Sequence, residues 1–190
     1  MGIWIMQSHY LDTVMDMVED ADNVLEIGGW LGGFTLMVDA ALQDGKAEIL
    51  TYENNYDMPF RFPNRTVTAK GMFPWGKFVH EVDLREKDIF DDIPIAADFI
   101  QREGKTVVFC DGGDKIREFD MLSPYLKSGD VICTHDYGLN HEDFSDIVGD
   151  AWDKEPQVVY EDIRPFVERE GLVPDESIDP KSIWGVFKKP

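Results

Sequence analysis

A glycine-rich turn between a strand-like run and a helix-like run constrains the fold of this chain most. Residues 24–27, Val-Leu-Glu-Ile, have the composition and length of a buried strand. Glycine pairs follow at positions 28–29 and 32–33, before the helix-like run 34–42. Because glycine has no Cβ, and because a helix N-terminus presents free N–H groups, such a turn lets the backbone approach a bound ligand closely.

The spacing of these glycines separates classes of ligand. A dinucleotide-binding turn needs glycines at n, n+2 and n+5, and Trp30 occupies the middle position when Gly28 is the first. The residues fit a different pattern, acidic-x-Gly-x-x-x-Gly, formed by Glu26, Gly28 and Gly32. An ordinary glycine-rich turn of an α/β protein would contain the same residues, so the motif needs support from the rest of the chain.

Apolar runs of strand length alternate with amphipathic stretches along the chain. This alternation is typical of βα units around a mostly parallel sheet. The chain has no repeat, low-complexity stretch or linker, so we expect one domain, 1–190, with an N-terminal helix within residues 1–20 and an irregular aromatic loop at 54–78. The predicted fold is α/β: a Rossmann-like three-layer sandwich with a mostly parallel seven-stranded sheet and helices on both faces.

The boundaries of the expected elements follow from the same patterns. The seven strands cover residues 23–27, 47–52, 78–82, 106–110, 131–134, 158–160 and 183–188, and a further short strand, 66–69, lies inside the loop. Helices are expected at residues 8–18, 32–42, 93–102, 115–126, 143–152 and 165–170.

The charge of the chain excludes some partners. It has 38 acidic and 18 basic residues, a formal net charge of −20. This charge repels the phosphate backbone of nucleic acids and the surface of anionic membranes, so we expect neither as a partner. Most of the acidic residues are expected to form a solvated surface.

The sequence predicts a cytoplasmic protein. No apolar run approaches the about 18 residues of a membrane span, and four acidic residues interrupt the first twenty positions, unlike a signal peptide. Cys110 and Cys133 lie in expected strands and are predicted to be buried free thiols. A homo-oligomer is compatible with the sequence, which does not fix the oligomeric state.

Acidic residues occur at or near the ends of five expected strands. They are Glu26, Glu53, Asp83, Asp111 and the Asp136 of the pair His135-Asp136. Because parallel strands place their carboxyl ends at one edge of a sheet, where ligands bind in open α/β folds, we expect these side chains to converge. A carboxylate at Glu53 can accept both hydroxyls of a ribose, since it offers two oxygens. A charged residue that begins a loop is the alternative interpretation of Glu53.

The motif of Glu26, Gly28 and Gly32 resembles the first motif of class I S-adenosylmethionine-dependent methyltransferases. Residues 107–137 resemble the small-molecule O-methyltransferase branch, in which a strand ending in Asp-Gly is followed by a helix, a glycine turn and a strand ending in a pair such as His-Asp, Asp-Asp or Glu-Asp. Here these are Asp111-Gly112 and His135-Asp136. Cephalosporin-hydroxylase-like, macrocin-type and rhamnosyl O-methyltransferase-like proteins share this layout. The resemblance covers about residues 20 to 137.

The resemblance implies a cofactor, an acceptor and a metal. S-adenosylmethionine would be held by Glu26, Gly28, Gly29, Gly32, Glu53, Asp83 and Asp111, with Asp83 on the adenine amino group. Asp111, His135 and Asp136 would be both the catalytic residues and the ligands of a divalent cation such as magnesium or manganese. The methyl acceptor would be a small molecule with a sugar or phenol hydroxyl. A hard cation there would lower the pKa of the hydroxyl and orient it, and methyl transfer depends largely on such alignment.

His135 departs from the strictest pattern, in which this position is a carboxylate. Imidazole suits manganese, iron or zinc better than magnesium. Without a metal, His135 would be a general base oriented by Asp136 or Asp111. A third interpretation makes His135 a helix-capping or hydrogen-bonded core residue. Of two nearby residues, Asp114 is expected to cap the following helix rather than support the site, and Trp30 to pack on the sheet rather than line the cofactor pocket.

Two other functions are kept beside the methyltransferase. A protein with this fold that has lost catalysis and only binds ligands would account for the unusual Trp30 and the irregular loop at 54–78. A metal-dependent hydrolase could use the same acidic edge, but it would leave the glycine motif unexplained.

Overall fold

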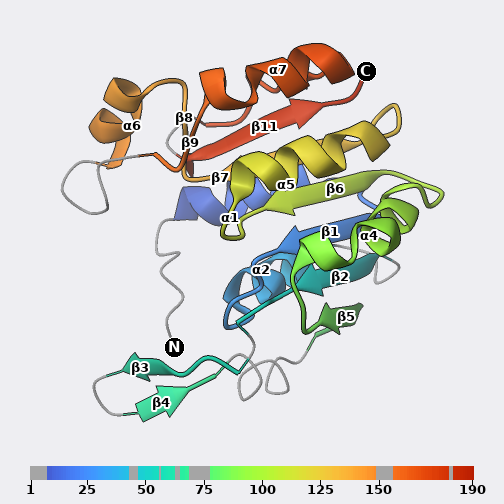
Figure 1. Ribbon diagram of the computed structural model, residues 1–190, viewed down its shortest axis with the longest axis vertical. Helices are drawn as coiled ribbons and strands as arrows, with labels where there is room; N and C mark the ends of the chain where they lie inside the picture. The colour runs from blue at the N-terminus through green and yellow to red at the C-terminus, as the bar shows by residue number, and fades with distance from the viewer. Residues whose placement is uncertain are drawn as a thin grey trace.

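A seven-stranded sheet in the order β10-β11-β7-β6-β1-β2-β5 forms the centre of the computed structural model (Figure 1). The structure describes residues 8–42, 47–55, 57–62, 65–68, 78–148, 156–179 and 182–190. The parallel strands are β7 (Val131–His135), β6 (Thr106–Cys110), β1 (Asn23–Ile27), β2 (Glu48–Tyr52) and β5 (Glu81–Arg85). β11 (Trp184–Lys188) pairs antiparallel with β7, and β10 (Val173–Pro174) antiparallel with β11. The predicted mostly parallel sheet is confirmed.

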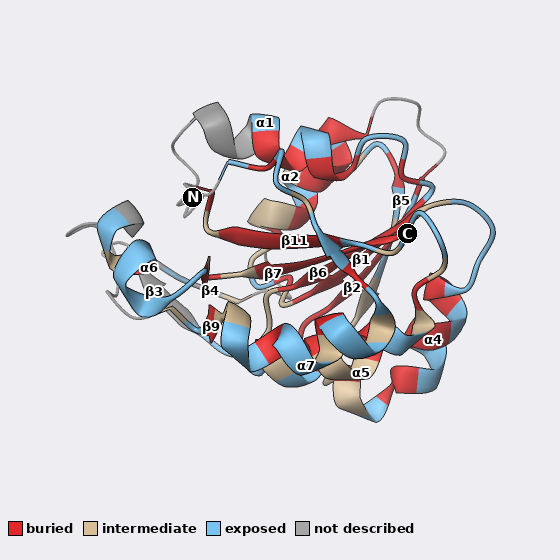
Figure 2. Ribbon diagram, turned by 90° about the horizontal axis from the view of Figure 1, so that it is seen from above, coloured by how far each residue is buried: buried red, intermediate tan, exposed pale blue. Residues whose placement is uncertain are grey.

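Helices cover both faces of the sheet, which completes the predicted three-layer sandwich (Figure 2). α1 (Ser8–Met17) and α2 (Gly33–Ala41) lie on one face. α4 (Ile93–Ile100), α5 (Lys115–Leu122) and α7 (Tyr160–Glu170) lie on the other. The smaller elements are η2 (Ile89–Asp91), η3 (Ser123–Tyr125), α6 (His141–Val148), the hairpin of β3 (Phe60–Phe62) and β4 (Arg65–Val67), and the pair of β8 (Tyr137–Gly138) and β9 (Val158–Val159).

Two hydrophobic clusters, one on each face, hold the helices to the sheet. Successive residues of β1 alternate between them: Val24 packs with residues of α1 and α2, and Leu25 with residues of α4, α5 and α7. Central strands buried on both faces are continuous apolar runs, which explains why β1, β2, β6 and β7 were predicted to within one residue. Cys110 and Cys133 are buried free thiols, as predicted, and burial raises the pKa of both.

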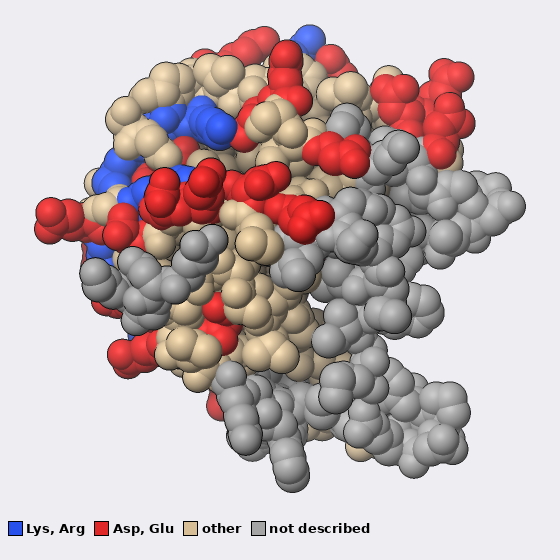
Figure 3. All heavy atoms as spheres, turned by 180° about the vertical axis from the view of Figure 1, so that it is seen from behind, with Lys and Arg blue, Asp and Glu red and all other residues tan. Residues whose placement is uncertain are grey.

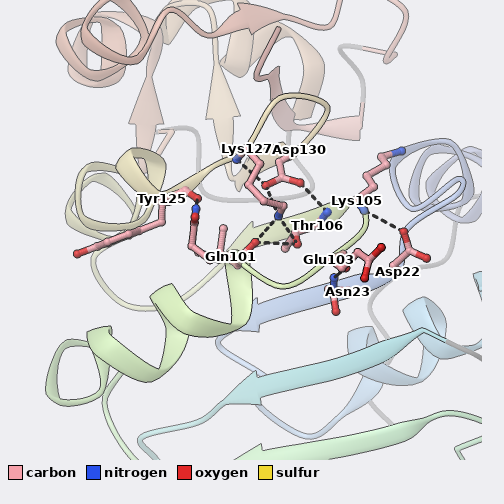
Figure 4. Close-up of polar contacts among 10 residues, drawn as sticks. Asp22, Asn23, Gln101, Glu103, Lys105, Thr106, Tyr125, Lys127 and Asp130 are labelled. Atoms are coloured by element: carbon pink, nitrogen blue, oxygen red, sulfur yellow. Dashed lines mark hydrogen bonds and ion pairs between the residues drawn. The ribbon is translucent and has the colours of Figure 1, made fainter.

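A polar network at the amino ends of β6 and β7 connects the chain segments there (Figure 4). Asp130 is fully buried and accepts hydrogen bonds from the backbone N–H groups of Thr106 (2.8 Å) and Lys127 (2.7 Å). The Lys127 ammonium lies 2.8 Å from the Asp130 carboxylate and also donates to the carbonyl of Ile100 at the end of α4. The network compensates the buried charge of Asp130 at the amino ends of the parallel strands, whereas the glycine turn lies at their carboxyl ends.

The third parallel strand differs from its predicted position. The expected strand 78–82 is β5, Glu81–Arg85, in which Glu81 pairs with Glu48 and Arg85 with Tyr52. The backbone N–H groups of Val79 and His80 donate to the Asp39 carboxylate of α2 instead of to a neighbouring strand. Asp83 therefore lies in the middle of the strand and not at its carboxyl end.

The C-terminal part also differs from the prediction. The expected strand 158–160 contributes only Val158 and Val159, which pair with β8 outside the main sheet. The Val159 N–H donates to the Asp162 carboxylate at 3.0 Å, which favours a helix start, and α7 begins at Tyr160, five residues before the expected helix. The seventh strand of the sheet is instead β10, which the sequence analysis missed.

Several predictions fall partly outside the described residues. The expected strand 66–69 corresponds to β4, whereas residues 69–77 of the aromatic loop are outside the described ranges, as are residues 1–7. The expected helix 143–152 corresponds to α6, which begins at His141, and residues 149–152 are not described. The expected helix 115–126 ends as α5 at Leu122 and continues as η3.

Acidic side chains are spread over the surface. Figure 3 shows one face on which Asp and Glu are scattered widely while Lys and Arg gather in a smaller group, in keeping with the net charge of −20. In the described ranges, every helix is too short or too polar to cross a membrane.

Candidate active site

The glycine turn after β1 brings two loops into close contact. Gly28 has a φ of +89°, and a Cβ there would lie 2.2 Å from the backbone carbonyl oxygen of Asp111, which follows β6. The N–H groups of Gly28 and Gly29 both donate to the carbonyl of Tyr52 at the end of β2 (2.9 and 3.0 Å). Gly32, with a φ of +77°, is the N-cap of α2. The turn thus joins the carboxyl ends of β1, β2 and β6, and only glycine fits at position 28.

Glu26 supports this turn from inside the sheet. Its side chain is 1 % exposed, and Oε2 accepts hydrogen bonds from the hydroxyls of Thr35 and Thr51, both at 2.6 Å. Oε1 is buried and makes no hydrogen bond within the described part of the chain. Burial raises the pKa of Glu26 to about 7, although the two threonine hydrogen bonds act in the opposite direction. Glu26 does not line the cleft described next.

A cleft of about 340 Å³ opens at the carboxyl ends of the parallel strands. Its lining comes from the last residues of β1 and β2, the loops after β1, β2, β5 and β6, the short helix η2 and one residue of α5, and it includes Gly28 and Glu53. The buried Glu53 carboxylate accepts hydrogen bonds from the backbone N–H groups of Trp30 and Asn55, both at 2.6 Å. The Trp30 side chain also lines the cleft and is 38 % exposed, so the prediction that it packs on the sheet is wrong.

The acidic residue that the third strand contributes to the cleft is not Asp83. The Asp83 side chain is 54 % exposed, lies 2.6 Å from the Arg85 guanidinium and does not line the cleft. Asp88, three residues beyond the end of β5, does line it, and its carboxylate accepts from the N–H of Phe90 at 2.9 Å. The displaced strand boundary explains why the sequence pointed to Asp83, and Asp88 was missed.

Asp111, His135 and Asp136 come together at the ends of the neighbouring strands β6 and β7. Each offers one ligand atom, and these atoms all lie within 4.8 Å of one another. His135 Nδ1 is 3.1 Å from Asp111 Oδ1 and 3.5 Å from Asp136 Oδ1. Asp136 has a φ of +53°, uncommon for a residue with a Cβ, and its buried Oδ1 makes no hydrogen bond within the described ranges.

The charges of this cluster shift two pKa values in opposite directions. Burial by itself would raise the pKa of Asp111, but His135 and Lys115 beside it lower that pKa overall. Burial by itself would lower the pKa of His135, but Asp111 and Asp136 raise it overall. The His135 ring also packs on Trp184 of β11, with ring centroids 4.6 Å apart. Of the five acidic side chains expected to converge, Asp111 and Asp136 meet here with His135 and Glu53 lines the adjoining cleft, whereas Glu26 and Asp83 do not line it.

Lys115, the first residue of α5, enters the same cluster and was missed by the sequence analysis. Its ammonium lies 3.2 Å from Asp111 Oδ1 and 3.4 Å from Asp136 Oδ2. The sequence shows that Asp111 and Lys115 lie four residues apart, between the end of a strand and the start of a helix. The contact of Lys115 with Asp136 cannot be seen there, because it depends on the pairing of β6 with β7. Asp114 caps α5 as predicted, accepting from the N–H of Arg117 at 3.3 Å.

Glu118 is a second buried acid that the sequence analysis missed. It lines the cleft, and its carboxylate accepts from the backbone N–H groups of Gly112 and Asp114 at 3.2 and 3.3 Å. Burial raises the pKa of Glu118 to about 7 against the opposing effect of these hydrogen bonds. It holds the loop after β6 in the shape that places Asp111.

Comparison with known proteins shows the fold. No protein-family model and no curated protein matches the sequence. The structure is similar to a candidate caffeoyl-CoA O-methyltransferase from Staphylococcus aureus, with a TM-score of 0.65, 18% identity, and coverage of 97% of this chain and 85% of that one. The fold is that of a Rossmann-like methyltransferase.

Two further solved structures contain cofactor or product. An O-methyltransferase from Bacillus cereus in complex with SAH has a TM-score of 0.56 at 16% identity, covering 95% of this chain and 80% of that chain. The O-methyltransferase TomG from Streptomyces achromogenes, in complex with SAM, has a TM-score of 0.55 at 15% identity, covering 95% and 78%. At such identities the similarity to these methyltransferases extends to the fold, and the function must be argued from the site.

Proposed function

We propose that this protein is an S-adenosylmethionine-dependent O-methyltransferase that acts on the hydroxyl of a small molecule, a sugar or a phenol. The observation that carries the proposal is the double position of Asp111. It lines the cleft beside the glycine turn and also belongs to the cluster with His135 and Asp136. A methyl donor in the cleft and a hydroxyl at the cluster would therefore meet at one residue. We include in this proposal the resemblance of residues 107–137 to cephalosporin-hydroxylase-like, macrocin-type and rhamnosyl O-methyltransferase-like proteins.

The cleft has groups suited to a nucleoside. The Glu53 carboxylate would accept the ribose hydroxyls, since each of its oxygens accepts one backbone hydrogen bond and has further acceptor capacity. Gly28, Gly29 and Gly32 would form the turn beside the cofactor, and Glu26 would support that turn from inside. We assign the adenine contact, expected for Asp83, to Asp88, which lines the cleft.

The transfer itself requires little covalent chemistry from the protein. The acceptor oxygen attacks the methyl carbon of the sulfonium, the carbon–sulfur bond breaks, and S-adenosylhomocysteine leaves while the hydroxyl proton passes to a base. His135 in its neutral form is the group of the cluster that can take this proton, because Asp111 holds its Nδ1 at 3.1 Å and raises its pKa, which makes the ring a stronger base. Holding donor and acceptor in line would supply much of the acceleration.

Asp111, His135 and Asp136 also fit a divalent cation. Their ligand atoms lie within 4.8 Å of one another, and the buried Asp136 Oδ1 makes no hydrogen bond within the described chain. Two carboxylates and an imidazole suit manganese, iron or zinc better than magnesium. Such an ion, when bound, would lower the pKa of the acceptor hydroxyl.

Calorimetry with S-adenosylhomocysteine tests the proposal. We expect binding by the unmodified protein and a loss of about tenfold or more in Glu53→Gln, because a neutral amide accepts fewer and weaker hydrogen bonds than a carboxylate. Asp88→Asn should also weaken binding, whereas Asp83→Asn, the matched control outside the cleft, should leave it unchanged. No binding of either S-adenosylmethionine or S-adenosylhomocysteine at high micromolar concentration would overturn the proposal.

Turnover separates the enzyme from the two other candidates. Methyl transfer to a panel of sugars and phenols supports the enzyme, while cofactor binding without transfer, with or without manganese, supports a protein that has kept the fold and lost catalysis. Metal-stimulated ester cleavage without any cofactor supports the hydrolase.

A further inference from the structure

Lys115 is held inside the candidate metal cluster by four oxygen atoms. Besides Asp111 and Asp136, its ammonium contacts Gln157 Oε1 at 2.6 Å and the carbonyl oxygen of Gly112 at 3.3 Å. Its side chain is 5 % exposed. An ammonium group has three donors, so this environment satisfies all of them without water.

We propose that Lys115 is the resident cation of the cluster of Asp111, His135 and Asp136, and that a divalent ion binds there only when the ammonium is displaced. This inference rests on the proposed methyltransferase function. It concerns the cation that neutralises the cluster, and therefore whether the methyltransferase depends on a metal.

Geometry supports the competition. Lys115 contacts Asp111 Oδ1, which also lies 3.1 Å from His135 Nδ1, and it contacts the second oxygen of Asp136. An ion bound by Asp111, His135 and Asp136 would therefore share the two carboxylates with an ammonium only a few ångströms away. Like charges at that distance repel strongly in a buried site, where screening by water is weak.

Charge counting leads to the same conclusion. An imidazole that binds a metal is neutral, so two carboxylates and His135 would give a divalent ion a ligand set of charge −2, and the Lys115 ammonium reduces the local charge to −1. The resident ammonium is pre-positioned, because Lys115 begins α5 directly after the loop that carries Asp111. If a divalent ion displaced the ammonium from Asp111 and Asp136, two of its N–H donors would be buried without a partner, or the side chain would have to leave its pocket.

The pair of Lys127 and Asp130 provides a matched comparison. It is also an ammonium beside a buried carboxylate, but it lies at the amino ends of β6 and β7 (Figure 4). There Asp130 accepts hydrogen bonds from two backbone N–H groups, and the described residues form no cluster of three metal-ligating side chains. Removing the Lys127 charge should not create a cation site.

The test measures manganese binding directly, through the loss of the electron paramagnetic resonance signal of free Mn²⁺ on titration at pH 7.5. We expect weak binding by the unmodified protein and binding tighter by about tenfold or more in Lys115→Met and Lys115→Gln, because a positive charge next to the ligands has been removed. Lys115→Arg, which keeps the charge, and Lys127→Met should bind as weakly as the unmodified protein. Adding Asp111→Asn to Lys115→Met should abolish the gain.

Two results would overturn the inference. One is micromolar manganese binding by the unmodified protein, a result that needs no variant to fold. The other is affinity in the folded Lys115→Met or Lys115→Gln protein that is no higher than in the unmodified protein. Calorimetry with S-adenosylhomocysteine on the same samples keeps the two proposals apart: loss of cofactor binding with a retained gain in manganese affinity contradicts the methyltransferase alone, and the reverse result contradicts the role of Lys115 alone.

Discussion

The α-carbon of Gly28 faces the backbone carbonyl of Asp111 so closely that a methyl group on it would lie 2.2 Å from the carbonyl oxygen. This contact joins the loop that would hold the cofactor to the loop that carries the first residue of the acidic cluster. Side-chain adjustment cannot relieve it, because the opposing atom belongs to the backbone.

Gly28→Ala should therefore lower the free energy of unfolding by about 2–4 kcal/mol, since it adds an overlap and puts a Cβ on a residue with positive φ. Urea unfolding measures the loss. Gly113→Ala is the matched control in the neighbouring loop, because a Cβ at position 113 meets no atom within 4 Å. Equal stability of the two variants would show that the loops can separate without cost.

Glu26 should make the protein less stable as the pH rises from about 4.5 to about 7. Its pKa is raised to about 7 in the folded state, so the folded protein binds the proton more tightly than the unfolded chain in this range. Stability is highest below pH 4.5 for this group, falls through the window by about 3 kcal/mol, and is flat above it.

Glu26→Gln should remove that part of the pH dependence, which urea unfolding at pH 5 and pH 7.5 can detect. The contribution of Glu118, whose pKa is also raised to about 7, should remain in this variant. Asp83→Asn is the exposed control and should keep the full dependence. An unchanged slope in Glu26→Gln would mean that the Glu26 carboxyl is hydrated in solution.

His135 should titrate above its ordinary value of 6.5. Burial opposes this shift, but Asp111 and Asp136 favour the imidazolium and prevail. The stabilisation from the charged ring is then fully present below pH 6.5 and is lost as the pH rises through the higher folded-state pKa. Nuclear magnetic resonance of the ring protons measures the pKa.

Asp111→Asn should lower the pKa of His135 because it removes the carboxylate 3.1 Å from Nδ1. Asp83→Asn, far from the ring in the fold, should not change it. A His135 pKa below 6.5 in the unmodified protein would falsify the assignment of a charge-stabilised ring.

Lys127→Met should destabilise the protein by about 3 kcal/mol, because it leaves the fully buried Asp130 without its ammonium partner. Two backbone hydrogen bonds to Asp130 remain and limit the loss. Binding of S-adenosylhomocysteine should be unaffected, since the pair lies at the other edge of the sheet. A loss below about 1 kcal/mol would contradict the role of Lys127 as the charge partner of Asp130.

The sequence predicts the central sheet well because its strands are buried on both faces and are therefore continuous apolar runs. The predicted strand 78–82 begins too early, because the backbone N–H groups of Val79 and His80 donate to Asp39 of α2. This is a tertiary contact that no local sequence pattern shows. β10 escaped prediction for another reason: its two residues are exposed and too short to form a pattern.

The candidate site shows the same division. Asp111, His135 and Asp136 follow strands whose ends are clear in the sequence, so their convergence could be predicted from the parallel order. Lys115 could not be placed, because its partners Asp136 and Gln157 lie 21 and 42 residues further along the chain. Long-range partners of this kind depend on which strands become neighbours, and that is decided by the whole sheet.

The position of β11 between β7 and β10 has a consequence for the order in which the protein can assemble. Trp184, against which the His135 ring packs, is synthesised after all three residues of the cluster. A nascent chain can pair its five parallel strands on the ribosome but still lacks one wall of the site. Ligand recognition at His135 should therefore begin only once β11 has left the ribosome and inserted into the sheet.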